Sequence, residues 1–173
     1  MSTFGGRDPL GYSEFHTITK NGMKFLIMSL DWRASAGTIA WAQTILDDYS
    51  ATPTILMSHE FLVPVVDPPD DGAGAAQTPY GKAVWDQLVR KNNNVFLVIC
   101  GHISASRHRI DQNDYGNDVF QILVDYQDMH AGGNAYMRLI EFDFLNSTME
   151  HLKFSPFVME LYNDQGRQAL GPK

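Results

Sequence analysis

The chain has 173 residues, of which 44% are hydrophobic and 12% aromatic. That is enough to bury one ordinary core but short for two full domains, so we expect a single domain over residues 1–173. The 20 acidic and 13 basic residues give a formal net charge of −7, which repels phosphate backbones and anionic lipid surfaces. Nucleic acid and membranes are therefore not expected as partners.

The sequence shows neither a signal-peptide pattern nor an apolar run long enough to span a bilayer. The compartment is therefore unassigned, with the cytoplasm as the default expectation. The lone cysteine, Cys100, has no second cysteine in the chain with which to form a disulfide, and it lies in an apolar run. A thiol in that setting is usually a small, buried and unreactive hydrophobe.

The first part of the chain predicts strands that alternate with helices. Apolar runs at residues 23–30, 52–58 and 95–100 are typical of buried strands. Between them, residues 35–49 and 80–91 place their apolar side chains at helical spacing. Strand, helix, strand, helix, strand is the order of parallel strands joined by crossovers, so an α/β fold is expected.

The segment 65–78 lacks periodicity and is rich in Pro, Gly and Asp. It predicts a flexible loop, either a mobile lid or an ordinary loop without function.

From Asp118 onward the pattern changes to a period of two residues. The alternating runs 120–126, 136–142 and 149–154 are separated by turn residues at 132–134 and 146–147. This pattern favours an antiparallel meander that follows the parallel βαβαβ part.

Two histidines follow buried strands directly and are the best candidates for chemistry. His59 comes after the run ending at Ser58, and His102 follows the run ending at Cys100 after a single glycine, Gly101. The carboxyl ends of parallel strands meet at one edge, so the two imidazoles would lie close enough to share one metal ion. Gly101 would let the backbone turn tightly there. The alternative is that each histidine simply ends its strand.

Other polar residues that follow His102 in the sequence are weaker candidates for the functional site. Arg107, His108 and Arg109 would form either a rim that attracts anions or an ordinary solvated loop. Asp125 would either orient a ligand histidine by accepting its second ring proton or pair with Arg138 across a hairpin.

Several segments, in this order, resemble the calcineurin-like metallophosphoesterases. They are residues 24–30, the helix around Trp41, and residues 55–59, 95–102, 123–127, 132–139 and 154–156. The resemblance covers most of the chain. It implies an αββα sandwich that hydrolyses phosphate esters with two adjacent metal ions.

The ligands of that family come from five blocks: Asp-x-His, Gly-Asp-x-x-Asp, Gly-Asn-His-Asp/Glu, a lone His after a strand, and Gly-His-x-His. By resemblance, His59 matches the fourth block and His102 the first histidine of the fifth, and both would bind the same ion. Ser104 stands where the second histidine of the fifth block is expected, and a hydroxyl is a poorer ligand than an imidazole. Blocks one to three have no counterpart, so the chain corresponds to the C-terminal half of a family member.

The resemblance therefore implies a partial αββα sandwich and an incomplete, weak site for manganese, zinc or iron. A working dinuclear centre needs several carboxylates, so we expect hydrolysis of a phosphoester substrate only when a partner supplies them. The missing half would leave a strand edge and a sheet face uncovered, which favours a homo-oligomer or a complementing chain. The alternatives are a noncatalytic, oligomerising binding or scaffold module and a segment of a longer active enzyme.

Overall fold

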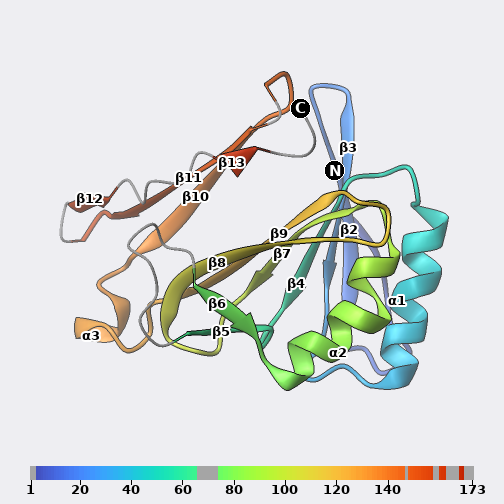
Figure 1. Cartoon of the computed structure of the whole chain (residues 1–173), viewed down its shortest axis with the longest axis horizontal. Coiled ribbons are helices and arrows are strands. Elements are labelled where there is room, and N and C mark those ends of the chain that lie inside the picture. Colours follow the sequence, from blue (N-terminus) through green and yellow to red (C-terminus); the bar gives the residue numbers. More distant parts are fainter. Residues whose placement is uncertain (1–2, 66–73, 147, 158–159, 163–167, 170–173) are drawn as a thin grey trace.

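The computed structural model describes residues 3–65, 74–146, 148–157, 160–162 and 168–169, with side chains described up to residue 157. The chain forms three layers: a helical layer, a seven-stranded sheet and a smaller sheet (Figure 1). The helices are α1 (Ala36–Asp48), α2 (Pro79–Gln87), the 3₁₀ turn η1 (Val89–Lys91) and the short turn α3 (His130–Gly133).

The large sheet has the order β1-β2-β3-β4-β7-β9-β8. Its strands are β1 (Phe4–Arg7), β2 (Glu14–Lys20), β3 (Met23–Ser29), β4 (Thr54–Ser58), β7 (Val95–Cys100), β8 (Ala105–Gln112) and β9 (Asp118–Asp125). The four strands β3, β4, β7 and β9 are parallel, whereas β1, β2 and β8 run antiparallel to their neighbours. The fold is therefore α/β with a mixed sheet.

The helices cover one face of this sheet because their apolar sides supply its core. Ala42 and Leu46 of α1 and Val84 of α2 pack with Leu26 and Leu56 of the central strands. Both α1 and α2 follow a residue suited to cap them: the hydroxyl of Ser35 accepts from Thr38 N–H, and that of Thr78 accepts from Gly81 N–H. No helix in the described part of the chain is long and apolar enough to cross a membrane.

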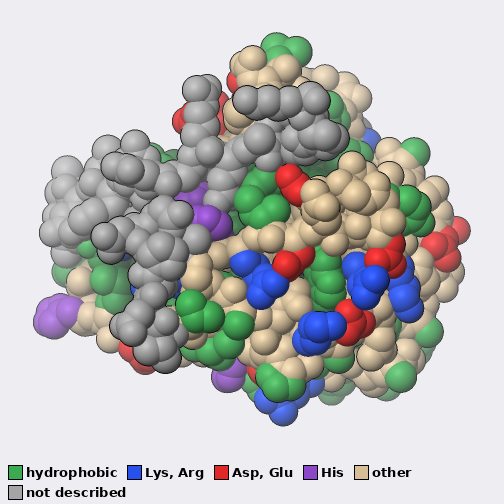
Figure 2. All heavy atoms as spheres, in the orientation of Figure 1, with side chains coloured by type: hydrophobic (Ala, Val, Ile, Leu, Met, Phe, Trp, Pro, Cys, Tyr) green, Lys and Arg blue, Asp and Glu red, His purple; other side chains and the backbone are tan. Residues whose placement is uncertain are grey.

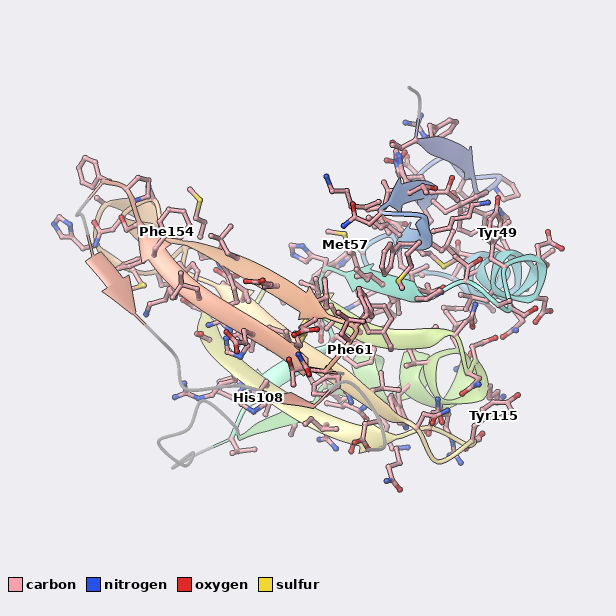
Figure 3. The ribbon with its side chains drawn as sticks, turned by 90° about the horizontal axis from the view of Figure 1, so that it is seen from above. Tyr49, Met57, Phe61, His108, Tyr115 and Phe154 are labelled. Carbon is pink, nitrogen blue, oxygen red and sulfur yellow. The ribbon has the colours of Figure 1, made fainter. Side chains whose placement is uncertain are left out.

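The smaller sheet lies against the opposite face, as the view from above shows (Figure 3). It contains β10 (Met137–Asp143), β11 (Thr148–Ser155), β12 (Glu160–Tyr162) and β13 (Gln168–Ala169). Met149 of β11 is fully buried against Leu97, Phe120 and Ile122 of the large sheet. This cluster joins the two sheets.

The elements predicted at 23–30, 35–49, 52–58, 80–91 and 95–100 are confirmed to within a few residues, and so is their parallel order. The assignment of 120–126 to an antiparallel meander is wrong. Residues 118–125 form β9, which lies between β7 and β8 and runs parallel to β7. Only the later strands belong to a separate antiparallel sheet, which begins with β10 and β11.

The expected loop over 65–78 is wrong in its last part, while residues 66–73 lie outside the described residues. Ala75–Gln77 form β6, which pairs with β5 (Leu62–Pro64), and Thr78 then caps α2. The strands β1, β2 and β8 were not predicted, since their sequences carry many polar residues. The basic residues 107–109 consequently lie in a strand instead of a loop.

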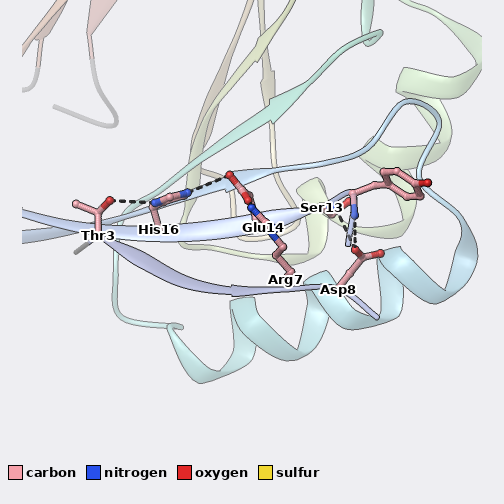
Figure 4. Close-up of polar contacts among 7 residues, drawn as sticks. Thr3, Arg7, Asp8, Ser13, Glu14 and His16 are labelled. Atoms are coloured by element: carbon pink, nitrogen blue, oxygen red, sulfur yellow. Dashed lines mark hydrogen bonds and ion pairs between the residues drawn. The ribbon is translucent and has the colours of Figure 1, made fainter. Parts of the chain in front are cut away.

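The turn between β1 and β2 is tied to α1 by the carboxylate of Asp8, which is almost fully buried. It accepts hydrogen bonds from the N–H groups of Tyr12 and Ser13 (Figure 4). It also accepts a hydrogen bond from the hydroxyl of Thr38. Burial alone would raise the pKa of Asp8, but these hydrogen bonds outweigh it and hold the pKa below its usual value.

On the face seen in Figure 2, Lys and Arg side chains lie beside Asp and Glu side chains. Three pairs on and near α2 show this mixing: Lys82–Asp86, Arg90–Asp86 and Arg90–Asp114. Positive and negative side chains are therefore mixed on and near α2.

Candidate functional site

The two candidate histidines lie side by side at the carboxyl ends of neighbouring parallel strands. Ser58 of β4 is level with Cys100 of β7, and Gly101 N–H donates to the carbonyl of His59 at 3.1 Å. The two imidazole centroids are 5.0 Å apart. The pairing of β4 with β7 therefore brings together the two side chains that the sequence singled out.

The ring of Trp32, which follows β3 in the chain, contacts both imidazoles. The indole of Trp32 lies 4.8 Å from the His59 ring and 4.5 Å from the His102 ring, centroid to centroid, in edge contacts with both. Trp32 is 43% exposed. Three successive parallel strands thus each contribute one ring to the cluster Trp32–His59–His102.

The residues that follow two of these rings form an ion pair. Arg33 Nε and Nη2 both donate to Oε2 of Glu60, at 3.1 and 3.0 Å. The Glu60 side chain is only 8% exposed, whereas that of Arg33 is 59% exposed. The Arg33 guanidinium also lies 5.2 Å from the centre of the Trp32 ring. The loops after β3 and β4 are therefore linked directly beside the ring cluster.

His102 has a strained backbone. Its φ is 69°, and Ile103 N–H donates to the carbonyl of Gly101, which closes a three-residue turn centred on His102. Turns of this kind with positive φ are rare for a side chain with a Cβ atom. The tight turn expected beside Gly101 is present, but its positive φ falls at His102, and a Cβ at Gly101 would meet only ordinary contacts at 3.5 Å or more.

We expect His102→Gly to be more stable than His102→Ala by about 1 kcal/mol, because only glycine adopts positive φ without strain. Urea denaturation of the two variants measures this difference. Both variants lack the imidazole, so the comparison isolates the backbone. Equal stability would show that the turn costs nothing.

Trp32 and His59 line an open cleft of about 630 Å³. His102 directly follows Gly101 of that lining, and its ring contacts the rings of Trp32 and His59. The lining of the cleft includes the apolar side chains of Met57, Ile99 and Val124. Ile99 and Val124 also pack against the cluster on the face of the large sheet opposite the helices. Asp31 and Tyr12 line the cleft beside Trp32. The cleft is therefore lined by both polar and apolar side chains.

The side chains at this cleft could supply some, but not all, of the ligands of a metal site. Zinc takes neutral imidazole nitrogens and usually has three or four protein ligands, and His59 and His102 would supply two of them. Neither ring is hydrogen-bonded to another group among the residues described, so their nitrogens are available. In the same residues, no group of three or more His, Cys, Asp or Glu side chains is placed to hold an ion.

The other predicted site residues lie apart from the ring cluster or are engaged elsewhere. Ser104 follows the His102 turn and is half-buried. Arg107 lies in β8, where its Nη1 donates to the carbonyl of Ser106. The Asp125 carboxylate accepts from Gln127 N–H at 2.9 Å, and Arg138 donates to the Ser106 hydroxyl. Neither predicted role of Asp125 is seen.

Arg109, the last residue of the expected basic rim, forms an ion pair with Asp111 at 2.5 Å. Its neighbour His108 lies near His151 of the small sheet, with the ring centroids 6.2 Å apart. These basic residues alternate along β8 and so point to its two faces, which argues against a single rim.

Sequence reasoning missed Trp32 and Arg33. A signal was present, since both follow the apolar run 23–30 at the edge that also carries His59. Cys100 lies below the cleft and is buried, and burial raises the pKa of its thiol to about 12. The thiol is therefore protonated at neutral pH and unreactive, as the sequence indicated.

The fold and cleft define an α/β protein with paired imidazoles at the edge of a mixed sheet. No family model matches the chain. The chain is similar to the uncharacterized protein YvnB of Bacillus subtilis (strain 168), with 27% identity over 163 residues. The match covers 91% of this chain but only 12% of that protein, so the chain spans a small part of the relative's length.

Proposed function

We propose that this chain is the C-terminal half of a metallophosphoesterase-like catalytic unit, in which His59 and His102 hold one side of a divalent metal ion. The observation that carries the proposal is the contact between the two imidazoles at the ends of adjacent parallel strands, 5.0 Å apart. The order of the resembling segments along the chain and the two packed sheets support it.

The chain's own part in the reaction is to position one ion from one side. A bound manganese, zinc or iron ion would polarise a phosphoryl oxygen and lower the pKa of bound water. His59 and His102 are neutral ligands, so they offset none of the positive charge of an ion. Carboxylates from another polypeptide segment would complete the centre. We therefore expect no phosphoester hydrolysis from this chain by itself.

The test is metal binding by the purified chain. We expect the parent protein to bind about one Co²⁺ or Zn²⁺ weakly, measured by calorimetry and, for cobalt, by its visible spectrum. The double variant His59→Ala/His102→Ala should lose this binding, because in the part of the chain that the structure describes these are the only imidazoles at or beside the cleft. A bis-aryl phosphate should not be hydrolysed by either protein.

His130→Ala is the matched control, since His130 is exposed, is the first residue of α3 and is not among the residues lining the cleft. It should bind metal as the parent does. Equal binding by the parent and the double variant would overturn the proposed site. Rapid hydrolysis by the parent would contradict the requirement for a complementing segment.

The second candidate function is a noncatalytic module that associates with a further copy of itself. In the described part of the chain, β10 pairs with β11 on one side only, and its Met137 and Leu139 are 43% and 54% exposed. An edge strand with exposed apolar side chains favours pairing with another chain. Light scattering on the same samples separates the two functions: dimers without metal binding favour the module, and a monomer that binds metal favours the metal site.

A further inference from the structure

We infer that Trp32 is a positioning residue for the two imidazoles: its indole fixes the rotamers of His59 and His102 and thereby sets the affinity of the site for a metal ion. This inference rests on the proposed function for its metal readout. It also has a readout that needs no metal.

The two imidazoles lack the partners that usually orient metal-binding histidines. Such histidines almost always donate their second ring N–H to a carboxylate, a backbone carbonyl or water. Here neither ring has a hydrogen-bond partner among residues 3–65, 74–146 and 148–157, and both side chains are exposed. Exposed side chains without such a bond normally exchange between rotamers.

The carboxylate that the sequence suggested for this role does not perform it. Asp125 lies near the His102 turn, with Oδ2 3.8 Å from where a Cβ on Gly101 would be. Its Oδ1, however, accepts from Gln127 N–H and so closes a local turn. The orienting contact must come from another group.

Trp32 is the ring that contacts both imidazoles. Its centroid distances, 4.8 Å to His59 and 4.5 Å to His102, fall within the range of favourable aromatic pairs, and the interplanar angle is 68° in each case. With the 5.0 Å between the two imidazoles, the three rings form a closed triangle. A rotation of either imidazole away from the cleft would break two of these contacts.

The indole is held in its own place. The Arg33 guanidinium lies 5.2 Å from the centre of the Trp32 ring and is anchored by two hydrogen bonds to the buried carboxylate of Glu60. Glu60 directly follows His59, so the ion pair and the ring contact join the same two loops. A fixed indole between two otherwise free rings reduces the conformational freedom that metal binding would have to remove.

The first experiment measures Co²⁺ affinity in three variants of the full chain. Trp32→Ala should bind Co²⁺ about 10- to 100-fold more weakly than the parent, the usual loss when an orienting residue is removed. Trp32→Phe keeps an aromatic ring and should recover most of the affinity. Tyr115→Ala removes an exposed aromatic side chain that is not among the residues lining the cleft, and it should match the parent.

The second experiment uses no metal. Three-bond Hα–Hβ couplings of His59 and His102, measured by NMR, should report a single χ1 rotamer in the parent and rotamer averaging in Trp32→Ala. Unchanged affinity and unchanged couplings in Trp32→Ala would overturn the inference. A parent that binds no metal but has fixed rotamers that Trp32→Ala releases would overturn the proposed function and leave the positioning role of Trp32 intact.

Discussion

Gly81→Ala should destabilise the protein by about 3 kcal/mol, near the upper end for an added methyl group in a packed interior. A Cβ at Gly81 would lie 2.0 Å from the carbonyl oxygen and 2.8 Å from the carbonyl carbon of Phe61. Both are backbone atoms, so no change of rotamer can relieve the clash. The same carbonyl accepts a hydrogen bond from Thr78 N–H at 3.0 Å, which fixes the start of α2 against the turn after His59.

The clash would also displace the loop that carries His59. We therefore expect Gly81→Ala to weaken metal binding as well as stability. Guanidinium denaturation measures the stability, and calorimetry measures the binding. The matched control is Gly37→Ala in α1, where the new Cβ would meet only the Ser35 hydroxyl at 3.6 Å. That change should be neutral or stabilising by up to about 1 kcal/mol, because alanine favours helix. Similar losses in both variants would contradict the role of the Phe61 contact.

Met149→Ala is the second large effect we expect, with a loss of about 2–5 kcal/mol. Met149 is fully buried between the two sheets, against Phe120 and Ile122. Its truncation leaves a cavity where the small sheet meets the large one. Hydrogen exchange should then become faster in β10 and β11 than in β4 and β7, since the small sheet depends on this contact.

Met137→Ala is the matched control, because Met137 lies on β10 of the same sheet and is 43% exposed. It should change the stability by less than about 1 kcal/mol. If the two methionine variants had equal stability, the small sheet would not be packed on the large one through Met149.

The parts of the fold that the sequence predicted are those in which a single pattern determines the element. β7 has no exposed residue and β4 exposes only Met57, so the apolar residues Ile55–Met57 and Val95–Cys100 run without interruption. The strand β8 was missed because its inner face makes polar contacts, such as that of Ser106 with Arg138. The period of two in β9 revealed a strand but not its neighbours, since parallel and antiparallel strands share that period.

The site was predictable to a similar degree. Histidines after two buried strands could be found from the sequence, because the ends of parallel strands gather at one edge. The contact of both rings with Trp32 could not, because it depends on the path of the loop after β3. The positive φ at His102 was also hidden, because histidine gives no sign of it in the sequence.

The register of β4 and β7 explains why the chain tolerates an unfavourable dihedral angle at His102. Because Ser58 is level with Cys100, His59 stands opposite Gly101, and His102 is one residue out of step. In extended strands that offset would send the two imidazoles to opposite sides of the sheet. The positive φ at His102 turns its imidazole toward that of His59. The distance between the two ring centroids is then close to the ordinary spacing of adjacent strands. The backbone conformation of His102 thus brings its imidazole to the same side of the sheet as that of His59, whereas the register of extended strands would place the two on opposite sides.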